Sequence, residues 1–237
     1  MKDNTYLDII TGLNNTITAK IVFVDFMNTI VVRNCTLRHL LKKWSQKLGK
    51  EFGIYPAYLY NYRLNIVAGK MHNIVPAGFI YQEIADQCIC HNIISDNRKN
   101  DFCQRAHDIE LECELKTQKL NKKIADFIRK QKGNGAQVYL LSDFRLPAND
   151  IKIFLERFDI LNFFNEVFSS CEFGMTKKDG SLYPAVIERI KANSNDIIMI
   201  GDNLNSDCIN ASNYGIRSFW LRKTLIQSIM YRICQCI

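Results

Sequence analysis

The stretch Ile21-Val22-Phe23-Val24-Asp25-Phe26-Met27-Asn28-Thr29-Ile30 decides the fold of this chain. An apolar run of four residues leads directly into a carboxylate, Asp25, and Thr29 follows four positions later. A short apolar run of this kind predicts a strand that is buried on both faces of a sheet. Open α/β sheets bind their ligands beyond the carboxyl ends of such strands, so Asp25 is predicted to lie where a ligand binds.

Further short apolar runs predict the other strands of the same sheet. They are Gln137–Leu141, Glu166–Ser169, Ile197–Ile200 and roughly Ile216–Trp220. Helical patterns separate the later runs, at Asn149–Phe158, Ser181–Ala192 and Asn205–Tyr214. Buried strands that alternate with helices predict an α/β fold, a Rossmann-like doubly wound parallel sheet with right-handed crossovers.

The stretch between the first and second predicted strands has a different pattern. Residues from about Thr36 to Gln131 show almost no strand signal and are predicted to form four or five helices. We therefore predict a helical cap domain at 34–132, inserted into a core made of 1–33 and 133–220. Gly133-Asn134-Gly135 would return the chain to the sheet. One helical repeat in the cap is formed by Leu37, Leu40, Leu41, Trp44 and Leu48.

The last segment, 221–237, has apolar residues at positions 225, 229, 233 and 237. This spacing predicts an amphipathic C-terminal helix. Docking onto the core is the expected role, and contact with a partner or a membrane surface is the alternative.

Composition restricts the classes of function. The net charge is +7, but Lys and Arg are scattered rather than gathered in a basic arm, so no nucleic-acid partner is predicted. No stretch reaches the ~18 apolar residues of a membrane span. Nine cysteines without a targeting signal are typical of reduced thiols, and we expect a cytoplasmic location. The C-x-C pairs at Cys88/Cys90 and Cys234/Cys236 do not have the spacing of common zinc sites.

Polar side chains follow the predicted strands in sequence order. Asp25 follows the first strand, Ser142 ends the second, Lys177 lies in the loop after the third, and Asp202 and Asp207 follow the fourth. Each one alone is explained equally well by a helix cap, a turn or a surface lysine. Because parallel strands all end at the same edge, the set can converge on one cleft.

Such a cleft suits phosphoryl transfer. The Asp25 carboxylate can attack phosphorus and form an aspartyl phosphate, while Lys177 neutralises charge on the phosphoryl oxygens. The Ser142 hydroxyl and the backbone N–H groups after Asp25 would complete the cradle. Oxygen ligands around a phosphate are typical of Mg²⁺. The predicted Mg²⁺ ligands are Asp25, the backbone oxygen of Met27, Asp202 and Asp207.

These motifs resemble those of the haloacid dehalogenase-like superfamily with a helical cap of the C1 type, and the resemblance covers nearly all of residues 20–220. It implies a hydrolase that uses Mg²⁺. More narrowly, the chain is similar to a subgroup found beside polysaccharide-assembly enzymes, which implies glycan-assembly proteins as partners. The stretches that carry the subgroup resemblance are Asp25–Arg33, Ser142–Pro147, Lys177–Tyr183 and Gly201-Asp202-Asn203.

The substrate is expected to be a small phosphorylated metabolite, with sugar phosphates among the candidates. Arg33 and Arg145 are close to the predicted site in sequence and suit an anionic substrate. Asp143 has two alternative interpretations, as a cap for the following helix and as a proton carrier. The full set of predicted substrate-binding residues is Thr29, Arg33, Asp143, Arg145 and Asn203.

Met27 stands where phosphatases of this superfamily have the acid that carries the proton. Such a group contributes ~10²–10⁴-fold to the rate, so turnover is predicted to be weak. No carboxylate lies between Asp25 and Thr29. Three interpretations remain: a Mg²⁺-dependent phosphohydrolase or phosphotransferase, a catalytically degraded module that binds a phosphometabolite or a partner, and a metal-independent dehalogenase.

Overall fold

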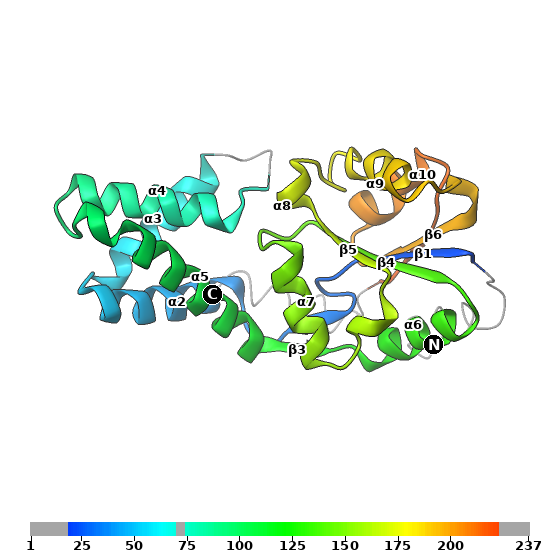
Figure 1. Cartoon of the computed structure of the whole chain (residues 1–237), viewed down its shortest axis with the longest axis horizontal. Coiled ribbons are helices and arrows are strands. Elements are labelled where there is room, and N and C mark those ends of the chain that lie inside the picture. Colours follow the sequence, from blue (N-terminus) through cyan, green and yellow to red (C-terminus); the bar gives the residue numbers. More distant parts are fainter. Residues whose placement is uncertain (1–18, 70–73, 223–237) are drawn as a thin grey trace, which may run out of the picture. The chain divides into compact units, whose positions relative to one another are not determined.

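The computed structural model describes residues 19–69 and 74–222, which form two compact units (Figure 1). We call the first one the sheet unit, and it contains residues 19–33 and 119–222. The second one, the helical unit, contains residues 34–69 and 74–118. The helical unit is therefore an insertion into the chain of the sheet unit.

The sheet unit is built on five parallel strands in the order β5-β4-β1-β6-β7. The strands are β1 (Ile21–Val24), β4 (Gln137–Ser142), β5 (Glu166–Ser169), β6 (Ile197–Gly201) and β7 (Arg217–Trp220). Sequence order and sheet order differ, so the chain crosses over between parallel neighbours. The predicted Rossmann-like doubly wound α/β sheet is confirmed.

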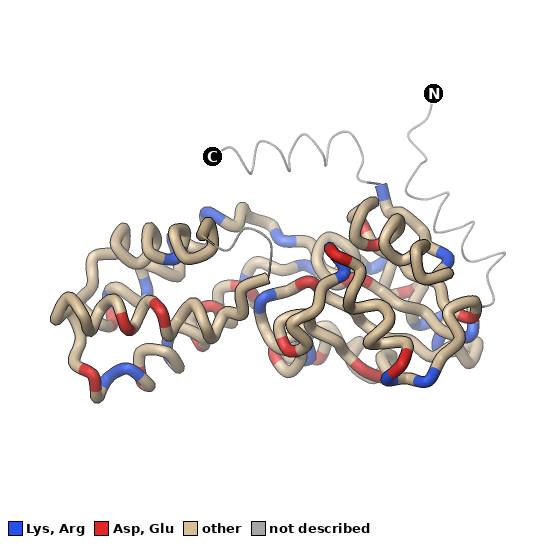
Figure 2. The backbone as a smooth tube through the Cα atoms, turned by 90° about the horizontal axis from the view of Figure 1, so that it is seen from above, with Lys and Arg blue, Asp and Glu red and all other residues tan. Residues whose placement is uncertain are grey.

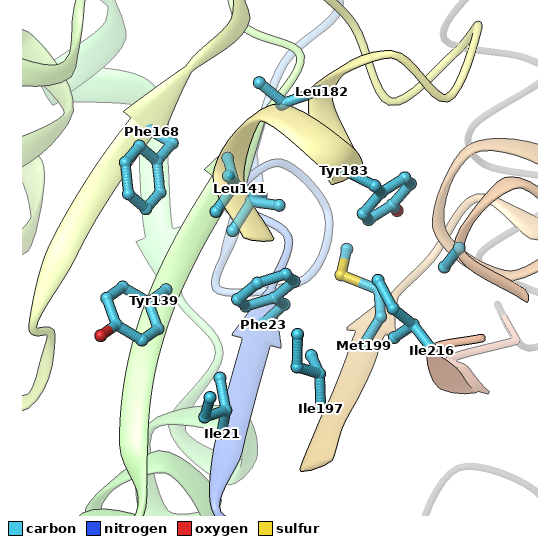
Figure 3. Close-up of a cluster of buried hydrophobic side chains, with 12 residues drawn as sticks. Ile21, Phe23, Tyr139, Leu141, Phe168, Leu182, Tyr183, Ile197, Met199 and Ile216 are labelled. Atoms are coloured by element: carbon cyan, nitrogen blue, oxygen red, sulfur yellow. The ribbon is translucent and has the colours of Figure 1, made fainter. Parts of the chain in front are cut away.

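The strands are apolar because helices cover both faces of the sheet. On one face, α9 (Leu182–Ile190) and α10 (Asn210–Ser212) pack over a cluster of buried side chains that includes Phe23, Tyr139 and Met199 (Figure 3). On the opposite face lie α6 (Lys122–Gly133) and α7 (Ala148–Arg157) (Figure 1). The central strand β1 is consequently buried along its whole length.

The three helical patterns predicted after the second strand all form helices, but the third begins as a π-helix instead of an α-helix. The first two correspond to α7 and α9, with ends that shift by a residue or two. The third forms a π-helical segment, η4 (Leu204–Ile209), that continues into α10. Wide turns of this kind are frequent at functional sites. The remaining helices of the sheet unit are α8 (Ser170–Phe173), η2 (Leu161–Phe163) and η3 (Ser194–Asp196).

The helical unit contains four α-helices and one short 3₁₀ turn. They are α2 (Leu37–Phe52), α3 (Pro56–Ala68), α4 (Ala77–Cys90), η1 (Asp96–Arg98) and α5 (Lys99–Thr117). Thr36 caps α2 by accepting the backbone N–H of His39, and Gly53 ends it in a left-handed conformation that favours glycine. Leu40, Trp44 and their partners in the predicted repeat are buried, apart from Leu37.

The boundary of the insertion differs from the prediction at its C-terminal end. The insertion ends at Gln118 rather than at 132, so α6 belongs to the sheet unit. The reason is that α6 packs against β4 and buries an apolar face that contains Ile124, Phe127 and Ile128. The region also contains a strand that was not predicted: β3 (Gln118–Leu120) pairs with β2 (Val31–Arg33) in a separate two-stranded sheet.

The predicted C-terminal helix falls almost entirely on residues 223–237, which lie outside the described residues. Among the residues that the structure describes, none of the helices has the length and apolar character that a membrane crossing needs. Lys and Arg residues are interspersed with Asp and Glu along the backbone of both units (Figure 2).

Candidate active site

The carboxyl edge of the sheet brings together polar residues from distant parts of the sequence. Asp25 directly follows β1, and its backbone N–H continues the ladder by donating to Ile200 O of β6 at 2.9 Å. Ser142 is the last residue of β4. Asp202 directly follows β6, and Asp207 lies in η4. Because all these strands are parallel, the side chains lie at one edge.

Lys177 connects two of the carboxylates. Its Nζ donates to Asp25 Oδ1 at 2.6 Å and to Asp207 Oδ1 at 2.7 Å. The side chains of Lys177 and Asp207 are almost completely buried, and Asp25 is 7% exposed. Buried charges are tolerated only where they are paired and hydrogen-bonded. The lysine thus serves as the counter-charge for two acids, one directly after β1 and one in η4 after β6.

The second oxygen of each paired carboxylate also has a donor. Thr29 Oγ1 donates to Asp25 Oδ2 at 2.9 Å, which fixes the orientation of the carboxylate. The backbone N–H of Asn203 donates to Asp207 Oδ2 at 2.9 Å. Gly201 makes room for this arrangement, because a Cβ at that position would overlap the Asp207 carboxylate.

Three carboxylates of this site are suited to a divalent cation. One oxygen from each of Asp25, Asp202 and Asp207 lies within 4.8 Å of the others, and no other such group of metal-ligating side chains occurs among the described residues. Hard oxygen ligands and spare negative charge fit Mg²⁺. With Lys177 as its only cation, this group of four side chains carries a net charge of −2 when all are ionised.

The electrostatics of the site show the same excess of negative charge. Burial raises the pKa of Asp25 to about 7; Lys177 opposes this effect, and the carboxylates of Asp207 and Asp202 reinforce it. Burial acts against the charge on Lys177, but Asp207 and Asp25 hold its pKa well above its ordinary value. A bound divalent cation would favour the ionised form of Asp25, since opposite charge favours ionisation.

The model of the haloacid dehalogenase-like hydrolases matches residues 19–215. This chain belongs to the haloacid dehalogenase-like hydrolases. The match covers the inserted helical unit and the sheet unit up to the residues before β7. The superfamily predicted from the motifs is therefore confirmed, and the chain is a member of a family of hydrolases.

Three solved structures have a similar fold. A 2-haloacid dehalogenase from Pseudomonas syringae pv. Tomato DC3000 aligns with a TM-score of 0.66 at 12% identity, over 86% of each chain. A predicted phosphoglycolate phosphatase from Haemophilus somnus 129PT aligns at 0.56 and 13% identity, over 90% of this chain and 92% of that one. A putative HAD-hydrolase from Bacillus subtilis, bound to magnesium, aligns at 0.57 and 14% identity, over 92% and 100%. The search of curated proteins gave no match.

The structure brings most of the predicted site residues of this hydrolase to one place. Asp25, Thr29, Lys177 and Asp207 form one hydrogen-bonded network, and Asp202 adds a third carboxylate. Asn203 contributes through its backbone N–H, and its side chain caps η4. The roles of these residues in catalysis and metal binding stay predictions.

The other predicted residues have different environments. Ser142 is buried at the end of β4, and Met27 is half-buried beside a single β-bridge to Val31. Arg33 ends β2 and Arg145 lies in the turn before α7, both half-buried. The roles assigned to the two arginines and to the Met27 backbone oxygen stay predictions.

Two residues that were not predicted contribute to the site. The Asn210 side-chain amide donates to the backbone oxygens of Lys177 at 2.9 Å and Lys178 at 2.7 Å. The Trp220 indole N–H donates to the backbone oxygen of Asp202 at 2.9 Å. Asn210 lies three residues after Asp207 in a predicted helix, and this spacing, which places side chains on one face, was the available signal.

Proposed function

We propose that this chain is a Mg²⁺-dependent phosphohydrolase or phosphotransferase that acts on a small phosphorylated metabolite through an aspartyl phosphate on Asp25. The observation that carries the proposal is the Lys177 ammonium shared between Asp25 and Asp207, beside the third carboxylate of Asp202. A metal-independent dehalogenase would need no metal ligands, so it would not explain the two further carboxylates of Asp202 and Asp207.

In the proposed reaction an Asp25 oxygen attacks phosphorus, the bond from phosphorus to the leaving oxygen breaks as the new bond forms, and the leaving oxygen takes a proton from water. Water or an acceptor hydroxyl then attacks the aspartyl phosphate, gives its proton to the phosphate or to solvent, and releases the Asp25 carboxylate. Thr29 holds the carboxylate in a single orientation through its 2.9 Å hydrogen bond. Lys177 stabilises negative charge on the transferring group.

Mg²⁺ bound by Asp25, Asp202 and Asp207, and by the predicted backbone oxygen of Met27, would neutralise charge on the phosphate. Ser142 is proposed to donate its hydroxyl to a phosphoryl oxygen. Arg33, Arg145 and the Asn203 side chain are proposed to bind the remainder of an anionic substrate. Ser142, Arg145 and Asn203 follow or end strands at the carboxyl edge of the sheet, whereas the role of Arg33, which ends β2 of the two-stranded sheet, rests on its closeness to Asp25 in the sequence.

The biological setting is proposed from the resemblance stated above. The subgroup with similar motifs and a C1-type cap is found beside polysaccharide-assembly enzymes, which favours a sugar phosphate as substrate and glycan-assembly proteins as partners. Seven cysteines within the described residues have free thiols, which supports a cytoplasmic location.

The alternative function is a module that binds a phosphometabolite or a protein partner without turnover. The observation that favours it is Met27, since no carboxylate lies between Asp25 and Thr29 to carry a proton. In this alternative the Mg²⁺ and phosphate sites persist, but the chemical step is lost.

Phosphate release from p-nitrophenyl phosphate and a panel of sugar phosphates, with Mg²⁺ and with excess EDTA, tests the proposal. The variants are Asp25→Asn and a matched surface control, Asp126→Asn, whose carboxylate is exposed on α6. We expect release by the wild type and the control in Mg²⁺, and none by Asp25→Asn or with EDTA. Equal, background release by all three proteins would reject the enzyme, and Mg²⁺-dependent phosphate binding without release would establish the alternative.

A further inference from the structure

Asp143 makes contacts that neither substrate binding nor proton transfer explains. Its Oδ1 accepts the backbone N–H of Lys177 at 2.9 Å, and its Oδ2 accepts the backbone N–H of Lys178 at 3.0 Å. One carboxylate thus binds two successive peptide groups more than thirty residues further along the chain. Hydrogen bonds from N–H groups to an ionised acceptor are stronger than those between neutral groups.

The same two peptide groups are held from the other side by Asn210. Its side-chain Nδ2 donates to the backbone oxygens of Lys177 and Lys178 at 2.9 and 2.7 Å. The backbone N–H groups and the backbone oxygens of Lys177 and Lys178 are therefore all bound by side chains from elsewhere in the sheet unit. We call Asp143 and Asn210 together the peptide clamp.

We propose that Asp143, assisted by Asn210, is a positioning residue that fixes the backbone of Lys177 so that Nζ stays between Asp25 and Asp207. A lysine has four side-chain torsions, so an ammonium at its end is well placed only when its backbone is fixed. The Nζ contacts of 2.6 and 2.7 Å are at the short end of the range for charged hydrogen bonds, which leaves little tolerance for displacement.

Apart from the clamp, the segment 175–178 is held by hydrogen bonds within its own loop and to the first residue of α9: Lys177 O accepts the N–H of Gly180, and Thr176 O accepts the N–H of Leu182, both at 3.1 Å. It lies between α8 and α9, outside any helix or strand; Thr176 and Lys177 are buried there, and Met175 and Lys178 are exposed. Local bonds shape the turn: Ser181 Oγ accepts the N–H of Thr176 at 3.1 Å, and Thr176 Oγ1 accepts the N–H of Asp179 at 3.1 Å. These bonds join residues that are close in sequence, whereas the clamp connects Lys177 and Lys178 to Asp143, which follows β4, and to Asn210 of α10.

The clamp gives Asp143 a role that differs from the substrate-binding and proton-carrying roles predicted for it. As a substrate ligand, Asp143 would bring negative charge to an anionic substrate. As a proton carrier, it would exchange a proton at an oxygen that already accepts a backbone N–H, and protonation would weaken its hold on that peptide group. A role in holding Lys177 uses both oxygens and explains why an acid directly follows Ser142 at the end of β4.

Only the kinetic test of this inference rests on the proposed function. The first test needs no enzyme activity, because it measures how readily the Lys177 amine is acetylated. Full-length protein in the presence of Mg²⁺ is treated with a limiting amount of acetic anhydride, and mass spectrometry gives the ratio of acetylation at Lys177 to that at Lys178. Lys177 is 1% exposed and Lys178 is exposed, so the neighbour is an internal reference. The variants are Asp143→Ala, Asp143→Asn and Asn210→Ala, with Ile128→Ala in α6 as a control for general loss of stability.

We expect Asp143→Ala to raise the Lys177:Lys178 ratio at least tenfold and Asn210→Ala to raise it several-fold. Asp143→Asn keeps the size and one acceptor, so it is expected to give an intermediate value even if the alanine variant folds poorly. Ile128→Ala is expected to leave the ratio unchanged. A wild-type ratio in both Asp143 variants would overturn the proposal, whether or not the protein has phosphatase activity.

Kinetics supply the second test where turnover is measured. If Lys177 is displaced in Asp143→Ala, kcat should fall at least tenfold while KM changes less than threefold. The kcat of Asp143→Asn should lie between those of the wild type and Asp143→Ala. A rise in KM at unchanged kcat would identify Asp143 as a substrate ligand and overturn the positioning role. A wild-type protein without turnover would reject the proposed function, while the acetylation ratios would still decide the role of the clamp.

Discussion

Substitution of Lys177 by Met tests whether the ammonium is the counter-charge of the site. Its Nζ lies 2.6 Å from Asp25 Oδ1 and 2.7 Å from Asp207 Oδ1. At an effective dielectric constant of about 20, each contact represents ~6 kcal/mol of gross attraction. The cost of burying the three charges offsets much of this, and removal of one partner from a buried ion pair costs ~3–5 kcal/mol.

This loss corresponds to a large change in the melting temperature of the metal-free protein. For a chain of this size, ~1 kcal/mol changes Tm by about 2–4 °C, so Lys177→Met is expected to lower Tm by roughly 6–20 °C. Scanning calorimetry in EDTA at pH 8 measures it, because that pH lies above the Asp25 pKa of about 7. The control is Lys178→Met, an exposed neighbour for which a change within ~0.5 kcal/mol is expected.

The pH dependence separates the loss of counter-charge from a simple packing defect. The folded-state pKa of Asp25 is raised above its unfolded value of 3.8, so its unfavourable contribution grows as pH rises from about 4 to about 7. Without Lys177 that pKa rises further, so the unfavourable contribution continues to grow above pH 7. The stability deficit of Lys177→Met should therefore shrink between pH 8 and pH 5.5, and Mg²⁺ should stabilise this variant more than the wild type. If Lys177→Met lost no more stability than Lys178→Met, or if its loss did not depend on pH, Lys177 would not be the counter-charge of the site.

Two further predictions concern the metal site and the helical unit. Gly201→Ala places a Cβ where the Asp207 carboxylate lies, so Mg²⁺ affinity measured by calorimetric titration should fall at least tenfold, and an unchanged affinity would contradict the predicted role of Asp207. Arg63→Met removes the charged partner of the buried Glu110, whose Oε1 lies 2.7 Å from Arg63 Nη2, and should cost ~3–5 kcal/mol in urea unfolding followed by circular dichroism. The double variant with Glu110→Met should recover most of that loss, and a double variant as unstable as the single one would show that the charge pairing is not the cause.

The sheet and the carboxylate cluster were predictable because both depend on local pattern. Ile21–Val24 is apolar and short, which is sufficient to identify a strand buried on both faces, and Asp25 is its immediate successor. Parallel strands then fix where Asp202 and Asp207 lie, since all ends share one edge. This prediction needs only the parallel direction of the strands, however far apart they lie in the sequence.

The contacts of Asp143 and the end of the insertion were not predictable in the same way. The partners of Asp143 are backbone N–H groups, which every residue except proline has, so no side-chain pattern marks them. Likewise α6 has the amphipathic pattern of any helix, and its sequence does not indicate whether its apolar face packs on the sheet or in the helical unit. Both features are decided by tertiary packing.

Met27 allows a test of what limits turnover in this hydrolase. Its side chain is half-buried two residues after Asp25, so an aspartate can be placed there without opening a large cavity. If the missing proton carrier limits the rate, Met27→Asp should raise kcat in Mg²⁺ at least tenfold, toward the ~10²–10⁴-fold that such a group supplies. Met27→Asn is the control, because asparagine has the size of aspartate but cannot act as a proton carrier. The double variant Met27→Asp/Asp25→Asn should be inactive. If the aspartate and asparagine variants had equal kcat, another step would limit the rate, and the absence of an acid at position 27 would not be a sign of lost function.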